Sequence, residues 1–141
     1  MDVRIKEATE SRTAVVVVEP MDLSKFMACF DAVYRFLGGG IEVTQTGQNV
    51  ARYDHGTRME VGVEVDRSFE PSDGVVPSHL PGGRVAHATH TGGFDTLRET
   101  YATIADWCKE HRHATTGVAW EIYGDPDEAG QVDVEVCLLL R

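Results

Sequence analysis

A single carboxylate inside an apolar segment is the residue of this sequence best suited to chemistry. Glu121 lies in Trp120-Glu121-Ile122-Tyr123, whose other side chains are large and apolar or aromatic. Side chains alternate along a strand, so Glu121 and Tyr123 share one face. If that face lines a cleft, an organic cation would supply the charge that a desolvated carboxylate needs, and Tyr123 would supply an aromatic face. Alternation equally allows Glu121 to face solvent on an edge strand while Trp120 and Ile122 face the core.

Four tyrosines occupy related places in the two halves of the chain. Tyr53 stands in the first half where Tyr123 stands in the second, and Tyr34 and Tyr101 lie on the two expected helices. Together they could form an aromatic box, since a phenol ring offers both apolar contact and a hydroxyl. For Tyr34 and Tyr101 the alternative is an ordinary core position on the apolar stripe of a helix, which is the more frequent arrangement.

The histidines favour a structural interpretation. His87 and His90 are three residues apart on an expected strand, so they face opposite sides and do not readily share a metal ion. His111 and His113 follow a helix end, where an imidazolium complements the helix dipole. His90 precedes Thr91-Gly92-Gly93 and could face the mouth of a cleft, although a hydrogen bond within that turn is the more frequent arrangement. We therefore expect no metal site.

The common catalytic and cofactor-binding motifs are missing from the sequence. The clusters Gly38-Gly39-Gly40 and Gly92-Gly93 lack the spacing of a phosphate loop or a dinucleotide fingerprint. No serine lies in a GxSxG turn. Cys108 falls on the apolar stripe of an expected helix, where burial raises the pKa of a thiol and makes it inert. We therefore expect neither a cofactor nor covalent catalysis.

Composition and charge narrow the class of protein. Of 141 residues, 42% are apolar, and 23 Asp and Glu against 13 Lys and Arg give a net charge of −10. This charge repels phosphate backbones and anionic lipids, so we expect no nucleic-acid or membrane binding, and it attracts cations. Three cysteines without CxxC spacing, and no apolar run near the roughly 20 residues that span a bilayer, indicate a cytoplasmic protein with free thiols.

The elements that position these residues follow a repeated order. Strands are expected over 12–18, 50–54 and 59–65, and again over 84–89, 120–123 and 132–140. One helix is expected to begin at Asp22 or Ser24 and to end before Gly38, and the other spans about 94–110. The polar residues 45–48 are expected to form a linker, and residues 69–81 a loop between the halves.

The two halves also resemble each other residue by residue. Val50-Ala51-Arg52-Tyr53-Asp54 matches Trp120-Glu121-Ile122-Tyr123-Gly124, and each is followed by an alternating Val-rich run. This match favours an internal duplication of a β-α-β-β unit. We therefore expect one α+β domain over 1–141, with repeats over about 12–66 and 82–140 and a connector over 67–81. The repeats would carry antiparallel sheets and two main helices around a cleft on a pseudo-two-fold axis.

The second half carries motifs of a known family. They are Gly82-Gly83-Arg84-Val85-Ala86-His87-Ala88-Thr89-His90-Thr91-Gly92-Gly93-Phe94, then Leu97, Tyr101 and Trp107, and finally Trp120-Glu121-Ile122-Tyr123-Gly124-Asp125-Pro126. They resemble the GyrI-like small-molecule-binding family, which also supplies the effector-binding domain of AraC-type and multidrug-responsive transcription regulators. The resemblance implies two β-α-β-β repeats around a cleft for lipophilic, often cationic compounds, with Glu121 at its centre. Such regulators carry a helix-turn-helix before this domain, for which the expected first strand leaves no room, so the chain looks like a stand-alone form.

The leading expectation is therefore a cytoplasmic protein that senses or sequesters a drug or toxin. Its ligand would be an amphipathic, cationic organic molecule. The expected contacts are Glu121, Tyr123, Tyr53, Tyr101, Tyr34, Phe94 and His90. The stand-alone members that the chain resembles leave two alternatives open: a hydrolase of cyclopropane-bearing toxins with Glu121 as general base, and a gyrase-inhibitor-like regulator that binds DNA gyrase or another protein. The sequence does not decide between a monomer and a homodimer.

Overall fold

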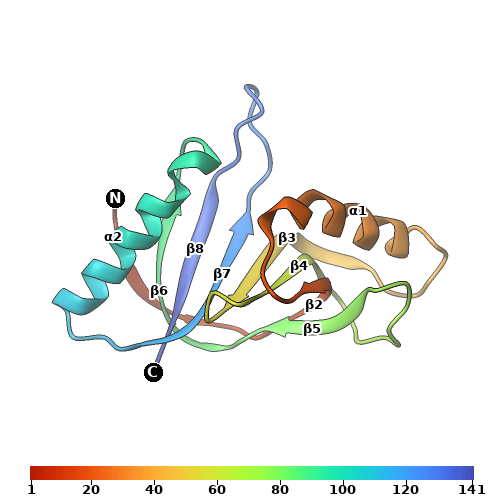
Figure 1. Ribbon diagram of the computed structural model, residues 1–141, viewed down its shortest axis with the longest axis horizontal. Coiled ribbons are helices and arrows are strands. Elements are labelled where there is room, and N and C mark those ends of the chain that lie inside the picture. The colour runs from red at the N-terminus through yellow and green to blue at the C-terminus, as the bar shows by residue number, and fades with distance from the viewer.

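An eight-stranded antiparallel sheet carries two helices on one face (Figure 1). The computed structural model describes residues 1–141. The strands are β1 (Arg4–Ala8), β2 (Ser11–Val18), β3 (Gln45–Asp54), β4 (Arg58–Val65), β5 (Val76–Leu80), β6 (Gly83–His90), β7 (Thr115–Tyr123) and β8 (Val134–Leu140). The helices are α1 (Phe26–Leu37) and α2 (Leu97–Glu110). Neither helix has the length and apolar character needed to span a bilayer.

Each half of the sheet has the same strand order. From the centre outwards, one half is β7, β8, β6 and β1, and the other is β3, β4, β2 and β5. The expected β-α-β-β order is therefore confirmed, as β2-α1-β3-β4 and β6-α2-β7-β8. The halves join through the antiparallel pair β3–β7, so one continuous sheet crosses the junction. The predicted α+β class with two main helices is confirmed.

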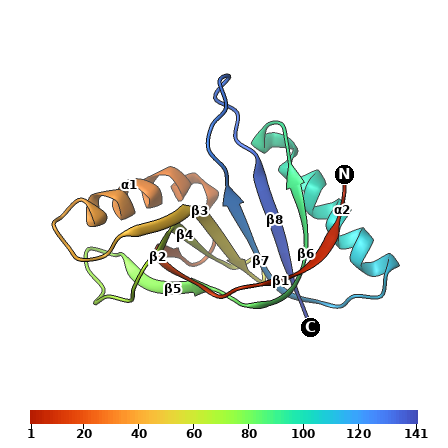
Figure 2. The same ribbon diagram turned by 180° about the vertical axis from the view of Figure 1, so that it is seen from behind.

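The helices leave the centre of the sheet uncovered. Both begin with one turn of 3-10 helix, over Leu23–Lys25 and Phe94–Thr96. The expected cap at Asp22 is present, because its carboxylate accepts a hydrogen bond from the Ser24 N–H at 3.0 Å. Helix α1 packs on β2 and β4, and α2 packs on β6 and β8, so the two helices lie apart on either side of β3 and β7 (Figures 1 and 2).

The main core lies between the helices and the sheet. Phe30 from α1 and Ile104 from α2 are buried in the same cluster as Met59, Val61 and Val136 from the strands. The apolar stripes of both helices therefore face one surface of the sheet, as their three-to-four-residue spacing requires.

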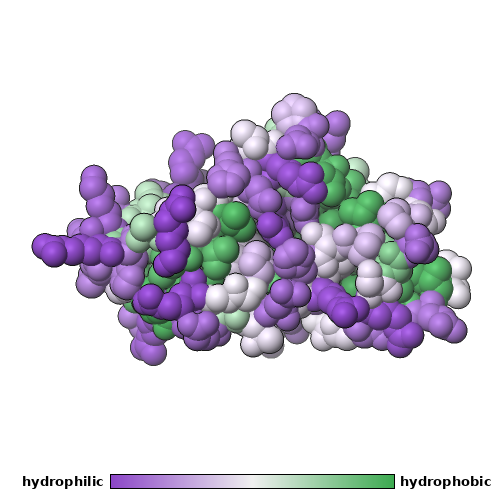
Figure 3. Space-filling model, turned by 90° about the horizontal axis from the view of Figure 1, so that it is seen from below, coloured by the Kyte–Doolittle hydropathy of each residue, from purple (hydrophilic) through white to green (hydrophobic).

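A two-stranded ribbon covers part of the opposite face of the sheet. The pairing of β1 with β6 and that of β2 with β5 share one register, so residues 4–15 and 76–87 form one antiparallel ribbon from one half to the other. Val50, Leu80 and Trp120 are buried together on this face. Figure 3 shows this face, which has apolar patches on either side of a largely hydrophilic middle.

Three segments differ from the sequence-based expectation. The expected linker over 45–48 is the start of β3, whose register with β4 shifts between Gln45 and Asn49. The expected loop over 69–81 contains β5, and β1 was not expected. Both β1 and β5 are edge strands, where alternating charges and a proline such as Pro77 are tolerated because one side of the strand needs no partner. Because charges and proline are also typical of loops, the sequence does not predict these two strands.

Gly62 on β4 lies where two strands approach unusually closely. A Cβ atom at this position would overlap the carbonyl oxygen of Ala14 and lie 2.9 Å from the Cα of Val15. Both neighbours belong to the backbone of β2, so they cannot move away as a flexible side chain would. Only glycine therefore fits this position without a shift of the strand.

Candidate functional site

Glu121 lies at the centre of the sheet, on the face that carries the helices. Its Cα partners are Ala51 on β3 and Val136 on β8. The residue is only 4% exposed. Trp120 points to the opposite face and is 2% exposed, because the ribbon side of the sheet is also packed. Strand β7 is thus buried on both faces, and Glu121 is neither on an edge strand nor in bulk solvent.

Tyrosine hydroxyls surround the carboxylate of Glu121. Tyr101 reaches it from α2 and donates a hydrogen bond to Oε2 at 2.5 Å. Tyr123, two residues along the same strand, donates to Oε1. Burial and the nearby charge of Glu121 raise the pKa of Tyr53 on β3, so its hydroxyl also lies close to the carboxylate. Three of the four tyrosines singled out in the sequence therefore meet at one carboxylate.

The negative charge of Glu121 forms no ion pair. Burial raises the pKa of Glu121 above its ordinary value of 4.5, while the hydroxyls of the three tyrosines act in the opposite direction. None of the seven ion pairs in the structure includes Glu121. Burial and the neighbouring carboxylate raise the pKa of Tyr101 above 10, so this phenol stays a proton donor. The three phenols are neutral donors, and the charge of His90 makes a smaller contribution that also lowers the pKa of Glu121.

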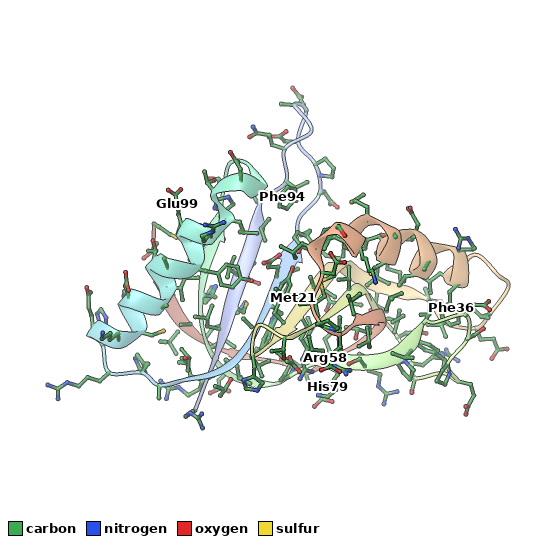
Figure 4. The ribbon with its side chains drawn as sticks, in the orientation of Figure 1. Met21, Phe36, Arg58, His79, Phe94 and Glu99 are labelled. Carbon is green, nitrogen blue, oxygen red and sulfur yellow. The ribbon has the colours of Figure 1, made fainter.

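Phenylalanines from both helix starts enclose the ring of Tyr123. The ring centroids of Phe26, Phe30 and Phe94 lie 5.8, 6.3 and 6.1 Å from that of Tyr123, all edge-on. Phe94 is 60% exposed and projects from the start of α2 beside the β7–β8 loop (Figure 4). Sequence analysis did not single out Phe26 and Phe30, because their spacing along a helix does not show which ring lies opposite them.

Tyr34 lies apart from the Glu121 cluster. It is 43% exposed, and its hydroxyl donates to Oδ1 of Asn49. Asn49 is the Cα partner of Tyr123, so Tyr34 lies toward the end of β7 rather than over its centre. The structure therefore does not bring all four tyrosines into one box.

His90 is engaged within its own turn. Its Nδ1 lies 2.6 Å from the hydroxyl of Thr100, and its Nε2 lies 2.9 Å from the carbonyl oxygen of Gly93. The side chain is buried and both ring nitrogens have partners. This geometry agrees with a hydrogen bond of His90 within its turn, which sequence analysis gave as the more frequent arrangement.

Two cavities lie away from Glu121. One, of about 750 Å³, lies between β2 and α1 and is lined mainly by residues 16–22 with small side chains of the helix. The other, of about 270 Å³, lies on the ribbon side of the sheet, against Trp120. Glu121 lines neither of them. Around Glu121 itself, aromatic side chains occupy the space between the helices.

The fold and this central cluster agree with a known family. Residues 43–141 match the GyrI-like small molecule binding domain. The chain belongs to this family. The finding confirms the resemblance carried by the second-half motifs, and the match also covers residues 43–66 of the first repeat. No curated protein matches the sequence at a significant level.

Solved structures share the fold of this GyrI-like domain. The EcmrR C-terminal domain matches with a TM-score of 0.86 at 15% identity, over 99% of this chain and 97% of that chain. A hydrolase from Listeria innocua matches with a TM-score of 0.68 at 12% identity, over 99% and 91%. SAV2435, solved bound to tetraphenylphosphonium, matches with a TM-score of 0.66 at 10% identity, over 100% and 94%. At such identities the likeness establishes the fold alone.

Proposed function

We propose that this GyrI-like domain binds an amphipathic organic cation at Glu121. The observation that carries the proposal is a carboxylate that is 4% exposed and takes part in none of the ion pairs of the structure. A buried carboxylate is costly unless a charge or several donors compensate it. Phenol hydroxyls compensate it only in part, since the pKa of Glu121 remains raised. A cationic ligand would complete the compensation.

The surroundings of Glu121 favour a lipophilic cation over a small hydrated one. Tyr123 and the three phenylalanines around it offer ring faces, which attract a diffuse positive charge, and apolar surface, which excludes water. The likeness in fold to SAV2435, which was solved with tetraphenylphosphonium, supports the same ligand class.

Ligand entry requires side chains to move, because aromatic groups fill the space over Glu121. Phe94 is the most exposed ring of the cluster and stands at its rim. Tyr101 holds Glu121 from a helix rather than from the sheet. We therefore expect the ligand to replace the Tyr101 hydroxyl at Oε2, with Phe94 turning against the ligand.

Paired ligands that differ in charge test this function. Purified protein is titrated by calorimetry with tetraphenylphosphonium and with triphenylphosphine oxide, a neutral aryl phosphorus compound. We expect saturable binding of the cation at one site, with the neutral compound at least about tenfold weaker. Equal affinities would contradict recognition of charge, and no binding of either would contradict this ligand class.

Hydrolysis is a second candidate function, favoured by the raised pKa of Glu121 beside phenol donors. The fold is also similar to that of a hydrolase from Listeria innocua. Glu121 would take a proton from water, and the oxygen would bond to a carbon of a strained cyclopropane as the ring C–C bond breaks. The released electron pair would pass to a conjugated carbonyl oxygen, to which Tyr123 or Tyr53 would donate a proton.

Mass spectrometry separates hydrolysis from binding. The protein is incubated with a cyclopropane-bearing alkylator, and products heavier by one water are followed over time. Turnover that disappears in Glu121→Gln, with the fold retained in circular dichroism, would support the hydrolase. An unchanged compound would reject hydrolysis of that substrate and leave binding as the function.

A further inference from the structure

The smaller cavity lies on the ribbon side of the sheet, opposite the face that carries Glu121. Its volume is about 270 Å³, just below the roughly 300–1,000 Å³ of pockets for drug-sized ligands, so it suits only a small molecule. It is lined by Lys6, Glu7, Ala8, Thr9, Ser11, Glu64, Leu80, Trp120, Ile122 and Cys137. These residues come from the ribbon on one side and from β4, β7 and β8 on the other. The walls are therefore held by paired strands rather than by loops.

The indole N–H of Trp120 lacks a hydrogen-bond partner in this cavity. Trp120 is 2% exposed, and none of the side-chain hydrogen bonds in the structure involves its N–H. No fully enclosed side-chain nitrogen or oxygen is left without a partner. The N–H therefore keeps some accessible surface, and Trp120 is one of the residues that line the cavity. A buried donor of this kind needs an acceptor from water or from a ligand.

The charged groups at the cavity limit what can bind. Lys6 Nζ is paired with Glu135 Oε2 at 2.7 Å, so its charge is already balanced. Glu64 accepts hydrogen bonds from the Ser11 hydroxyl at 2.6 Å and from the Gln48 N–H at 3.4 Å, one on each oxygen, and each oxygen has a second lone pair left. Together with Glu7, it disfavours an anion. An ammonium or phosphonium group has no lone pair to offer the N–H of Trp120, so the group that faces this N–H must be a neutral acceptor.

We propose that this cavity binds a small, uncharged, planar carboxamide. The carbonyl oxygen would accept from the indole N–H of Trp120, and the amide NH₂ would donate to Glu64. The ring would pack against Leu80 and Ile122, which are two of the five hydrophobic residues of the lining. The proposal does not depend on the function of Glu121, because the two sites lie on opposite faces of β7.

Nuclear magnetic resonance of the indole N–H tests the proposal directly. The protein labelled with ¹⁵N shows one indole signal for each of its 2 tryptophans, and Trp107→Phe assigns the signal of Trp120. Benzamide is titrated to millimolar concentrations, with ethylbenzene as a ring of similar size that lacks an acceptor. We expect a saturable downfield shift of the Trp120 signal with benzamide and none with ethylbenzene. No shift with benzamide, or equal shifts with both, would overturn the proposal and indicate a cavity that holds only water.

A cavity-filling variant locates the binding. Ala8 lines the cavity and is half-buried, so Ala8→Leu narrows it with little change elsewhere. Ala105→Leu, on the exposed side of α2, is the matched control. We expect at least a tenfold loss of benzamide affinity in Ala8→Leu and an unchanged affinity in Ala105→Leu. A full benzamide response in a folded Ala8→Leu protein would place the ligand elsewhere and overturn the assignment. If Ala8→Leu fails to fold, the titrations of the wild-type protein with benzamide and ethylbenzene still test the proposal.

Discussion

Ala51 and Glu121 are direct partners across the β3–β7 pair, and they hold equivalent positions in the two repeats. The pairs on either side are Asn49 with Tyr123 and Tyr53 with Ala119. Both pairs obey the same symmetry, so the pseudo-two-fold axis passes between Ala51 and Glu121. A second glutamate at position 51 would place two like charges in one buried site. The small side chain of Ala51 therefore leaves one carboxylate at the centre of the molecule.

The raised pKa of Glu121 predicts a pH dependence of stability. Its pKa in the folded protein lies above the ordinary value of 4.5. Protonated Glu121 contributes to the stability of the folded protein. This contribution is complete below about pH 4.5 and is lost as the pH rises through the pKa that Glu121 has in the folded protein. We therefore expect the free energy of unfolding of the wild type, relative to that of Glu121→Gln, to fall over this range. Urea unfolding at a series of pH values measures it.

Comparison with Glu121→Gln removes the effect of other carboxylates. Asp22 and Asp66 have a lowered pKa, mainly because of the hydrogen bonds that they accept, and they titrate in the opposite sense. Both are present in the two proteins, so their contributions cancel in the difference. A difference that stays constant, or that grows with pH, would show that burial does not raise the pKa of Glu121.

The close approach of β2 and β4 predicts a large effect at Gly62. We expect Gly62→Ala to destabilise the protein by about 3 kcal/mol or more, because the new methyl group would overlap the backbone of Ala14. Gly56→Ala is the control, since nothing lies within 4 Å of a Cβ there and only its positive φ of 69° opposes the change. We expect about 1 kcal/mol at Gly56. Equal thermal stabilities of the two variants would contradict the strand contact.

The partners of His90 predict a structural rather than a ligand-binding role. Thr100→Val removes the hydroxyl beside Nδ1 and should cost about 1–3 kcal/mol, because a buried ring nitrogen loses its partner. Thr103→Val removes an exposed hydroxyl on the same helix and should cost less than about 0.5 kcal/mol. Neither change should alter the affinity for tetraphenylphosphonium. A tenfold loss of affinity in a stable Thr100→Val protein would instead make His90 part of the ligand site.

The order of elements was predictable because its signals are local. Apolar spacing and the Asp22 cap marked α1, and alternation marked the strands of both repeats. Strands β1 and β5 could not be found in this way. They are edge strands whose charges and proline suit a loop equally well, and their pairing depends on a partner about 70 residues away.

The sequence predicted part of the cluster around Glu121 but not its geometry. Alternation correctly put Glu121 and Tyr123 on one face. It could not show which face is covered, because the burial of Trp120 on the other side depends on the ribbon. The contacts of Phe26 and Phe30 with Tyr123 likewise depend on how α1 crosses the sheet. The placement of Tyr34 at Asn49 depends on the same crossing.

The most direct test of cation recognition is the change in ligand affinity on Glu121→Gln for two ligands of different charge. The calorimetric Kd of wild type and variant is measured for tetraphenylphosphonium and for triphenylphosphine oxide. We expect the variant to lose roughly 1–3 kcal/mol of binding free energy for the cation and to keep its affinity for the neutral compound. An equal loss for both ligands, or no loss for the cation, would contradict a charge pair at Glu121.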